Sequence, residues 1–210
     1  MNKAVALTCA ALALQVSAVG WLVWRYECIM RNGTEFRLEC RAYDPYDPLC
    51  GRYLGMTVSE ECTNILFKVT EEHIWRRTNE KAFAKLVKMP GGNGLYRIDA
   101  IAREAMGDGL WVKPESLRIE YALGYSDKRK NESDAEFKAR REKAGFKAVM
   151  SFPGQLFVSE KIAPEAEKLL RKKSDSAVAV YRAYDGRIVL THIEIDGKPI
   201  QSAVGEGRQN

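Results

Sequence analysis

An uncharged apolar segment opens the chain. Residues 4–24 contain no charged side chain, and their clearly polar members are Thr8, Gln15 and Ser17. At a rise of about 1.5 Å per residue, this segment forms a helix of about 31 Å, which matches the hydrocarbon core of a bilayer. The pattern predicts one transmembrane anchor over residues 1–25, followed by a single domain over residues 26–202.

The same segment has a second interpretation as a cleaved signal peptide, because Ala18-Val19-Gly20 resembles a small-x-small cleavage site. The apolar run continues past this site to Trp24, which favours an uncleaved anchor. Basic groups flank the segment almost equally, so the positive-inside rule does not choose an orientation. A very short N-terminal tail is typical of a signal-anchor, and in a bacterium this predicts a periplasmic or extracellular domain.

Beyond the anchor, apolar and polar positions alternate in short runs. In residues 34–43, Phe36, Leu38 and Cys40 alternate with charged side chains, which is the pattern of a half-buried strand. Further strands are expected at residues 52–58, 65–69, 82–89, 95–101, 110–112, 117–125, 149–152, 156–158, 177–184 and 187–195. An Asp185-Gly186 turn joins the last two into a closing hairpin.

Two short helices are expected among these strands. Ser133 and Glu136 form a capping box that predicts a helix from residue 134 to 144, inside a charged insertion over residues 127–145. Pro164 suits the first turn of a second helix. The polar tail, residues 203–210, is expected to be frayed. The fold class is therefore α+β and β-rich: one transmembrane helix, then one predominantly antiparallel β domain with two short helices.

Composition excludes several classes of protein. With 46% hydrophobic and 29% charged residues in 210, the chain is neither disordered nor a multi-span membrane protein. A net charge of +5 is too small to indicate nucleic acid as a partner. In the 127–145 insertion the two signs alternate closely, which favours a solvated, salt-bridged helix. Binding of acidic lipid by this helix is the alternative.

Four cysteines lie in the first part of the domain, at Cys28, Cys40, Cys50 and Cys62. In an oxidising compartment they allow three disulfide pairings, between which the sequence does not choose, and free thiols are the alternative. A zinc site is not expected, because no two cysteines have the close spacing of zinc ligands and neither histidine is near them. We expect disulfides if the domain is exported, and no metal.

The sequence contains no complete catalytic constellation, and no cofactor is expected. His73 and His192 are its two histidines, and each is best explained as a structural residue. A Ser/Lys hydrolase stays open, because no motif fixes a particular pair. The turn Asp44-Pro45-Tyr46-Asp47-Pro48 carries two carboxylates that could bind calcium or act as acid and base. An aspartate before proline more often caps its own turn, and Glu160 has the same two interpretations.

The run RAYDPYDPLCGRYLGMTV resembles the signature of the GDYXXLXY proteins, in which a DP-containing turn precedes G-D-Y-x-x-L-x-Y. Gly51 and Tyr53 match the first and third letters, whereas Arg52, Met56 and Val58 replace the Asp, Leu and final Tyr. The later runs FPGQLFVSEKIAPEAEKLLRK and VAVYRAYDGRIVLTHIEIDGKPI are similar to the family's aromatic segment and closing hairpin. The resemblance therefore covers nearly the whole chain.

The resemblance implies a membrane-anchored protein without an established activity, which often accompanies multi-span membrane proteins. It implies binding positions at Asp44, Pro45, Asp47, Gly51, Tyr53 and Glu160. The resulting hypothesis is a non-enzymatic module that binds a membrane-protein partner or an envelope component. The alternative is an envelope hydrolase that uses carboxylates and tyrosines near the DPYDP turn.

Overall fold

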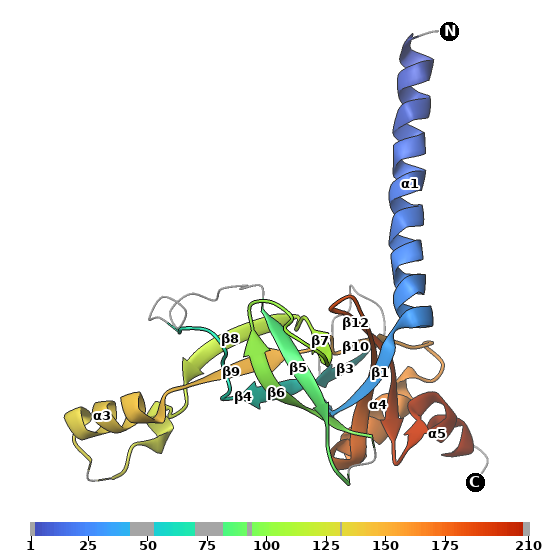
Figure 1. Cartoon of the computed structure of the whole chain (residues 1–210). Coiled ribbons are helices and arrows are strands. Elements are labelled where there is room, and N and C mark those ends of the chain that lie inside the picture. Colours follow the sequence, from blue (N-terminus) through green and yellow to red (C-terminus); the bar gives the residue numbers. More distant parts are fainter. Residues whose placement is uncertain (1–2, 43–52, 70–81, 92–93, 131, 208–210) are drawn as a thin grey trace.

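A computed structural model describes residues 3–42, 53–69, 82–91, 94–130 and 132–207. Figure 1 shows a long N-terminal helix that rises from a β-rich domain. Helix α1 spans Lys3–Asn32, and by length and composition it is able to cross a membrane. It continues eight residues beyond the apolar segment and ends at Asn32. The N–H of the next residue, Gly33, donates to the Ile29 carbonyl at 2.9 Å.

In the described part of the chain, short antiparallel strands form four sheets with the orders β1-β11-β12-β13, β10-β3-β2, β4-β9-β8 and β6-β5-β7. The fold class predicted from the sequence is confirmed. The strands are β1 (Thr34–Glu39), β2 (Arg41–Ala42), β3 (Tyr53–Thr57), β4 (Ser59–Cys62), β5 (Phe83–Lys88), β6 (Tyr96–Ala102), β7 (Leu110–Val112), β8 (Ser116–Tyr121), β9 (Phe146–Ser151), β10 (Gln155–Phe157), β11 (Ala177–Tyr184), β12 (Arg187–Ile195) and β13 (Lys198–Pro199).

Strand β11 lies at the centre of the core. It pairs with β1 on one side, in register from Thr34↔Ala183, and with β12 on the other. Its Tyr181 is fully buried and stacks on Phe36 at 5.2 Å between ring centroids. The buried Tyr181 hydroxyl donates to the Pro153 carbonyl at 2.8 Å, because a buried polar group is costly unless it is hydrogen-bonded. This bond connects β11 to the β9–β10 turn.

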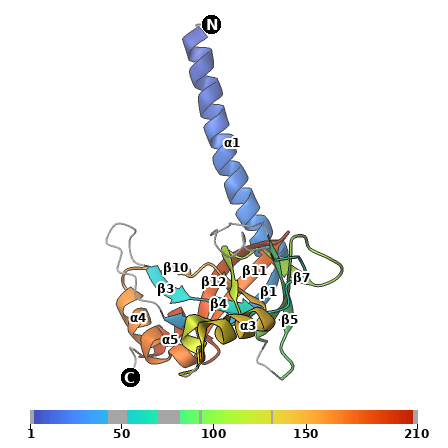
Figure 2. The same cartoon turned by 90° about the vertical axis from the view of Figure 1, so that its left-hand side faces the viewer.

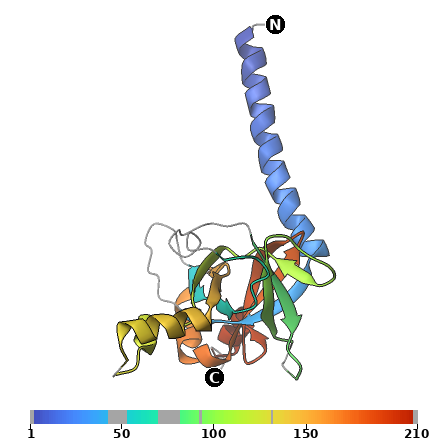
Figure 3. The same ribbon diagram turned by 60° about the vertical axis from the view of Figure 1, so that its left-hand side comes forward.

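Within the described ranges, three short helices complete the domain. Helix α3 spans Asp134–Ala144 with the Ser133–Glu136 capping box in place, and its bounds are the predicted ones. It lies at the end of the domain remote from α1 (Figures 1 and 3). Helix α4 (Ala163–Lys172) has proline in its first turn, and α5 spans Ile200–Gly207. Figure 2 shows α4 and α5 together on one flank of the sheets. Two 3-10 turns, η1 (Tyr125–Asp127) and η2 (Ser174–Ser176), connect elements.

Three local expectations differ from the structure. The expected frayed tail is the helix α5 as far as Gly207, because Ile200 and Val204, one turn apart, are both buried. Residues 65–69 form only an isolated bridge, Ile65↔Ile101. Strand β4 was not expected, because its sequence SEEC is polar; it forms because β9 pairs with it from Ser59↔Ser151 to Cys62↔Ala148.

Candidate functional site

The implied binding positions are only partly described. Asp44, Pro45, Asp47 and Gly51 lie outside the described residues, as do Cys50 and His73. Tyr53 begins β3 and pairs with Phe157, the last residue of β10. Because these strands are antiparallel, the segment after Phe157 leaves the sheet at the end of β3 where Tyr53 lies. That segment carries Glu160, which is exposed in the turn before α4, so the Tyr53 and Glu160 positions belong to the same end of the β10–β3 strand pair.

An acidic cavity of about 610 Å³ lies beside β2, β3 and β4. It is lined by four carboxylates and one guanidinium, together with smaller groups: Glu39, Glu60, Glu61, Asp175, Arg41, Cys40, Thr57, Ser59 and Ala177. Burial, and then the nearby charge of Glu39, raise the pKa of the Glu60 carboxyl. An excess of negative charge in a partly desolvated hollow attracts cationic groups. Sequence patterns gave no sign of this cavity, because its residues come from separate strands.

The thiol that lines this cavity, Cys40, is not suited to nucleophilic chemistry. Burial raises the pKa of Cys40 to about 12, so the thiol stays protonated and is a poor nucleophile. A carboxylate with a raised pKa, such as Glu60, is a feature of some acid–base sites, but also of structural clusters. Among the described residues, no group of three or more His, Cys, Asp or Glu side chains is arranged to hold a metal ion.

His192 lies in a polar cluster on the surface of β12. Its Nδ1 is 3.1 Å from the Thr191 hydroxyl oxygen and its Nε2 is 3.3 Å from the Glu194 carboxylate. Glu194 also accepts from Arg37 of β1 at 3.4 Å, and the Thr191 hydroxyl donates to the Val180 carbonyl at 2.8 Å. The Thr191 hydroxyl beside the imidazole therefore already donates a hydrogen bond within the sheet. Through these contacts the cluster joins neighbouring strands.

The described cysteines carry free thiols. Cys40 and Cys62 are buried in the β domain, Cys28 is half-buried near the end of α1, and Cys9 is exposed on α1. Because Cys50 lies outside the described residues, the disulfide pairing stays a prediction.

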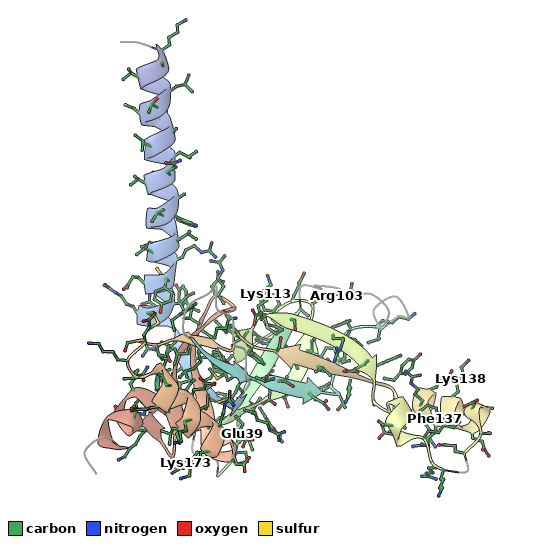
Figure 4. The ribbon with its side chains drawn as sticks, turned by 180° about the vertical axis from the view of Figure 1, so that it is seen from behind. Glu39, Arg103, Lys113, Phe137, Lys138 and Lys173 are labelled. Atoms are coloured by element: carbon green, nitrogen blue, oxygen red, sulfur yellow. The ribbon has the colours of Figure 1, made fainter. Side chains whose placement is uncertain are left out.

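The charged insertion pairs its own charges. Arg140 donates to both carboxylate oxygens of Glu132 at 2.8 Å, and Lys128 bonds Asp134 at 2.5 Å. The Arg141 guanidinium lies 3.8 Å from the centroid of the Tyr121 ring, which packs the helix against β8. These contacts support the interpretation as a solvated, salt-bridged helix. In Figure 4, Phe137 and Lys138 mark this helix at the opposite end from α1.

The junction between α1 and the domain has no linker. Ile29 is 7% exposed and packs on the domain, and Arg182 of β11 donates to the Met30 carbonyl. At Gly33 a β-carbon would lie 2.3 Å from the Ile29 carbonyl oxygen and 3.2 Å from that of Ala183. Only glycine therefore lets the helix end approach β11 this closely. The helix is held at a fixed place on the domain.

One side of the domain faces the direction in which α1 rises. Figure 4 places Arg103 and Lys113 on this side, and Glu39 and Lys173 on the opposite one. The Arg103 guanidinium lies 5.3 Å from the Phe67 ring centroid, and the Lys113 ammonium 5.9 Å from that of Phe83. The acidic cavity, which Glu39 lines, thus belongs to the side away from α1.

Comparison with known proteins gives one family. A family model described as GDYXXLXY protein matches residues 15–193, from within α1 to β12. No curated protein matches the chain, and no solved structure does.

Proposed function

The chain belongs to the GDYXXLXY family, and on that premise we propose that it is a membrane-anchored, non-enzymatic module that binds a membrane-protein partner. The proposal places the β domain outside the cytoplasm, as the signal-anchor pattern predicts. The observation that carries it is the linker-free junction between an apolar helix of membrane-spanning length and the domain.

The anchor is supported by the distribution of side chains along α1. Residues 4–24 are uncharged, and Trp21 and Trp24 lie together at the end of this run, with ring centroids 5.2 Å apart. Tryptophan favours the boundary between hydrocarbon and headgroups. Residues 25–32 then continue the helix for about 12 Å at 1.5 Å per residue.

This geometry supports the proposal of a partner in the same membrane. A short, rigid stem holds the domain near the membrane surface and in one orientation, so it restricts the domain to targets at that surface. A soluble enzyme that acts on diffusing substrates gains nothing from such a restriction, whereas a module that contacts a membrane protein gains a preformed orientation. The hydrolase alternative requires Asp44, Asp47 and Glu160 to converge on a substrate, and the described part of this set, Glu160, is exposed in a turn.

The test is purification of the full-length protein from its native membranes in mild detergent. We expect a multi-span membrane protein in stoichiometric amount, and none with an unrelated single-pass protein that carries the same tag. Recovery of the chain alone would contradict the partner, and release of the chain from membranes by alkaline carbonate would contradict the anchor.

A further inference from the structure

A polar amide lies near the middle of the apolar part of α1. Gln15 is close to the centre of residues 4–24, and within the described chain its side chain makes no hydrogen bond. Thr8 differs, because its hydroxyl donates to the Ala4 carbonyl of the same helix at 3.0 Å. If α1 spans a bilayer, as the proposed function holds, the Gln15 amide lies in hydrocarbon, where an unpaired polar group is unfavourable.

The residues around Gln15 form a face suited to close helix packing. Thr8, Gln15 and Leu22 recur every seven residues, and the small Ala11 and Ala18 lie between them. This spacing places all five on one side of a helix. Small residues beside a polar one let a neighbouring helix approach closely enough to hydrogen-bond in a membrane. We name these five residues the Gln15 face.

The Gln15 face lies on nearly the same side of α1 as the domain. Ile29, seven residues after Leu22, is the α1 residue most deeply buried against the domain, and Arg25 and Cys28 beside it are half-buried. A seven-residue series drifts by only about 20° per repeat along a straight helix. A helix packed on the Gln15 face would therefore stand on nearly the same side of α1 as the domain, which extends away from the foot of α1 in Figure 1.

The position of the domain below the Gln15 face decides which kind of helix packs on that face: one from a second copy of the chain or one from another membrane protein. A parallel second copy on the Gln15 face would need room for its own residues 25–32 and its own domain, where the first copy's β11 and β12 already contact α1. A helix that ends at the membrane surface needs no such room. We propose that the Gln15 face packs against a helix of a multi-span membrane protein, with the Gln15 amide bonded to a polar side chain of that helix, directly above the domain. This inference rests on the proposed function and names the contact within it.

Matched variants of the full-length chain test the contact. Gln15→Leu removes the amide from the face, and Ser17→Leu makes the same kind of change at nearly the same depth, about 200° around the helix. We expect Gln15→Leu to lower recovery of the multi-span partner about three- to tenfold, the range typical of interhelical hydrogen bonds, and Ser17→Leu to leave it within about twofold. Resistance of both variants to alkaline extraction shows that each is still inserted.

A photoreactive residue identifies the neighbour directly. Placed at Leu22, on the Gln15 face, it should crosslink to an apolar segment of the multi-span protein, whereas at Trp24, on the far side, it should not. If both leucine variants recover the partner like the wild type, the inference is wrong and the proposed function stands. If the wild type is solitary, the proposed function fails and the inference with it. A crosslink at Leu22 between two differently tagged copies would overturn the inference in favour of self-association.

Discussion

Replacing Gly33 with alanine is expected to destabilise the junction between α1 and the domain. A β-carbon at this position would lie 2.3 Å from the Ile29 carbonyl oxygen, far inside van der Waals contact, and 3.2 Å from the Ala183 carbonyl oxygen. Both neighbours are backbone atoms, so no side chain can rotate away. Relief requires the last turn of α1 to move from β11, against the bond from Arg182 to the Met30 carbonyl.

Overpacking of this kind costs about 1–3 kcal/mol, which for a domain of this size lowers the melting temperature by about 2–12 °C. The assay is thermal unfolding of the full-length protein in detergent, with limited proteolysis to locate the loosened segment. Gly205→Ala is the matched control, because nothing lies within 4 Å of its β-carbon position in α5; there alanine should raise stability by up to about 1 kcal/mol. A Gly33→Ala protein that melts like the wild type, with no new cleavage near the junction, would refute the tight, linker-free attachment.

Three further changes test other parts of the structure. Tyr181→Phe removes the hydroxyl that donates to the Pro153 carbonyl and should lower the free energy of unfolding by about 1–3 kcal/mol in urea titrations; an unchanged midpoint would contradict that bond. Burial and a neighbouring carboxylate raise the pKa of Glu60 in the folded state. The protonated Glu60 side chain therefore contributes stability in acid, and this contribution is lost as pH rises through the folded pKa. Glu60→Gln should raise the melting temperature at pH 7 but not at pH 4. Hydrogen bonds, above all those from Arg140, lower the pKa of Glu132 to about 2. This stabilisation is present above the ordinary glutamate pKa and is lost as pH falls towards 2, so the protection factors of the α3 amides in hydrogen exchange should fall over that range in the wild type. In Arg140→Ala they should already be low at neutral pH and change little on acidification.

Local signals in the sequence predicted several elements closely. The Ser133–Glu136 capping box predicted where α3 begins, because the cap and the first turn are made by neighbouring residues. The Asp185-Gly186 turn did the same for the closing hairpin, in which Asp185 and Gly186 both adopt positive φ angles.

Elements that depend on distant partners were not predictable in this way. Strand β4 is polar and forms because β9 lies alongside it, and α5 forms because two apolar side chains find the core. The acidic cavity has the same origin, since Glu39 and Glu60 come from different strands. Gln15 is recognisable in the sequence as a polar residue within the anchor. The side of α1 on which it lies relative to the domain is known only from the structure, through the contact of Ile29 with the domain.

The decisive measurement is the orientation of the chain in the membrane. The full-length protein, tagged at its N-terminus and expressed in its native host, would be treated with protease in intact spheroplasts. If the β domain lies outside the cytoplasm, it is digested from outside while the N-terminal tag and the apolar part of α1 remain with the membrane. A domain that stays intact until the membrane is disrupted, or a chain that alkaline carbonate washes from the membrane, would contradict the proposed function.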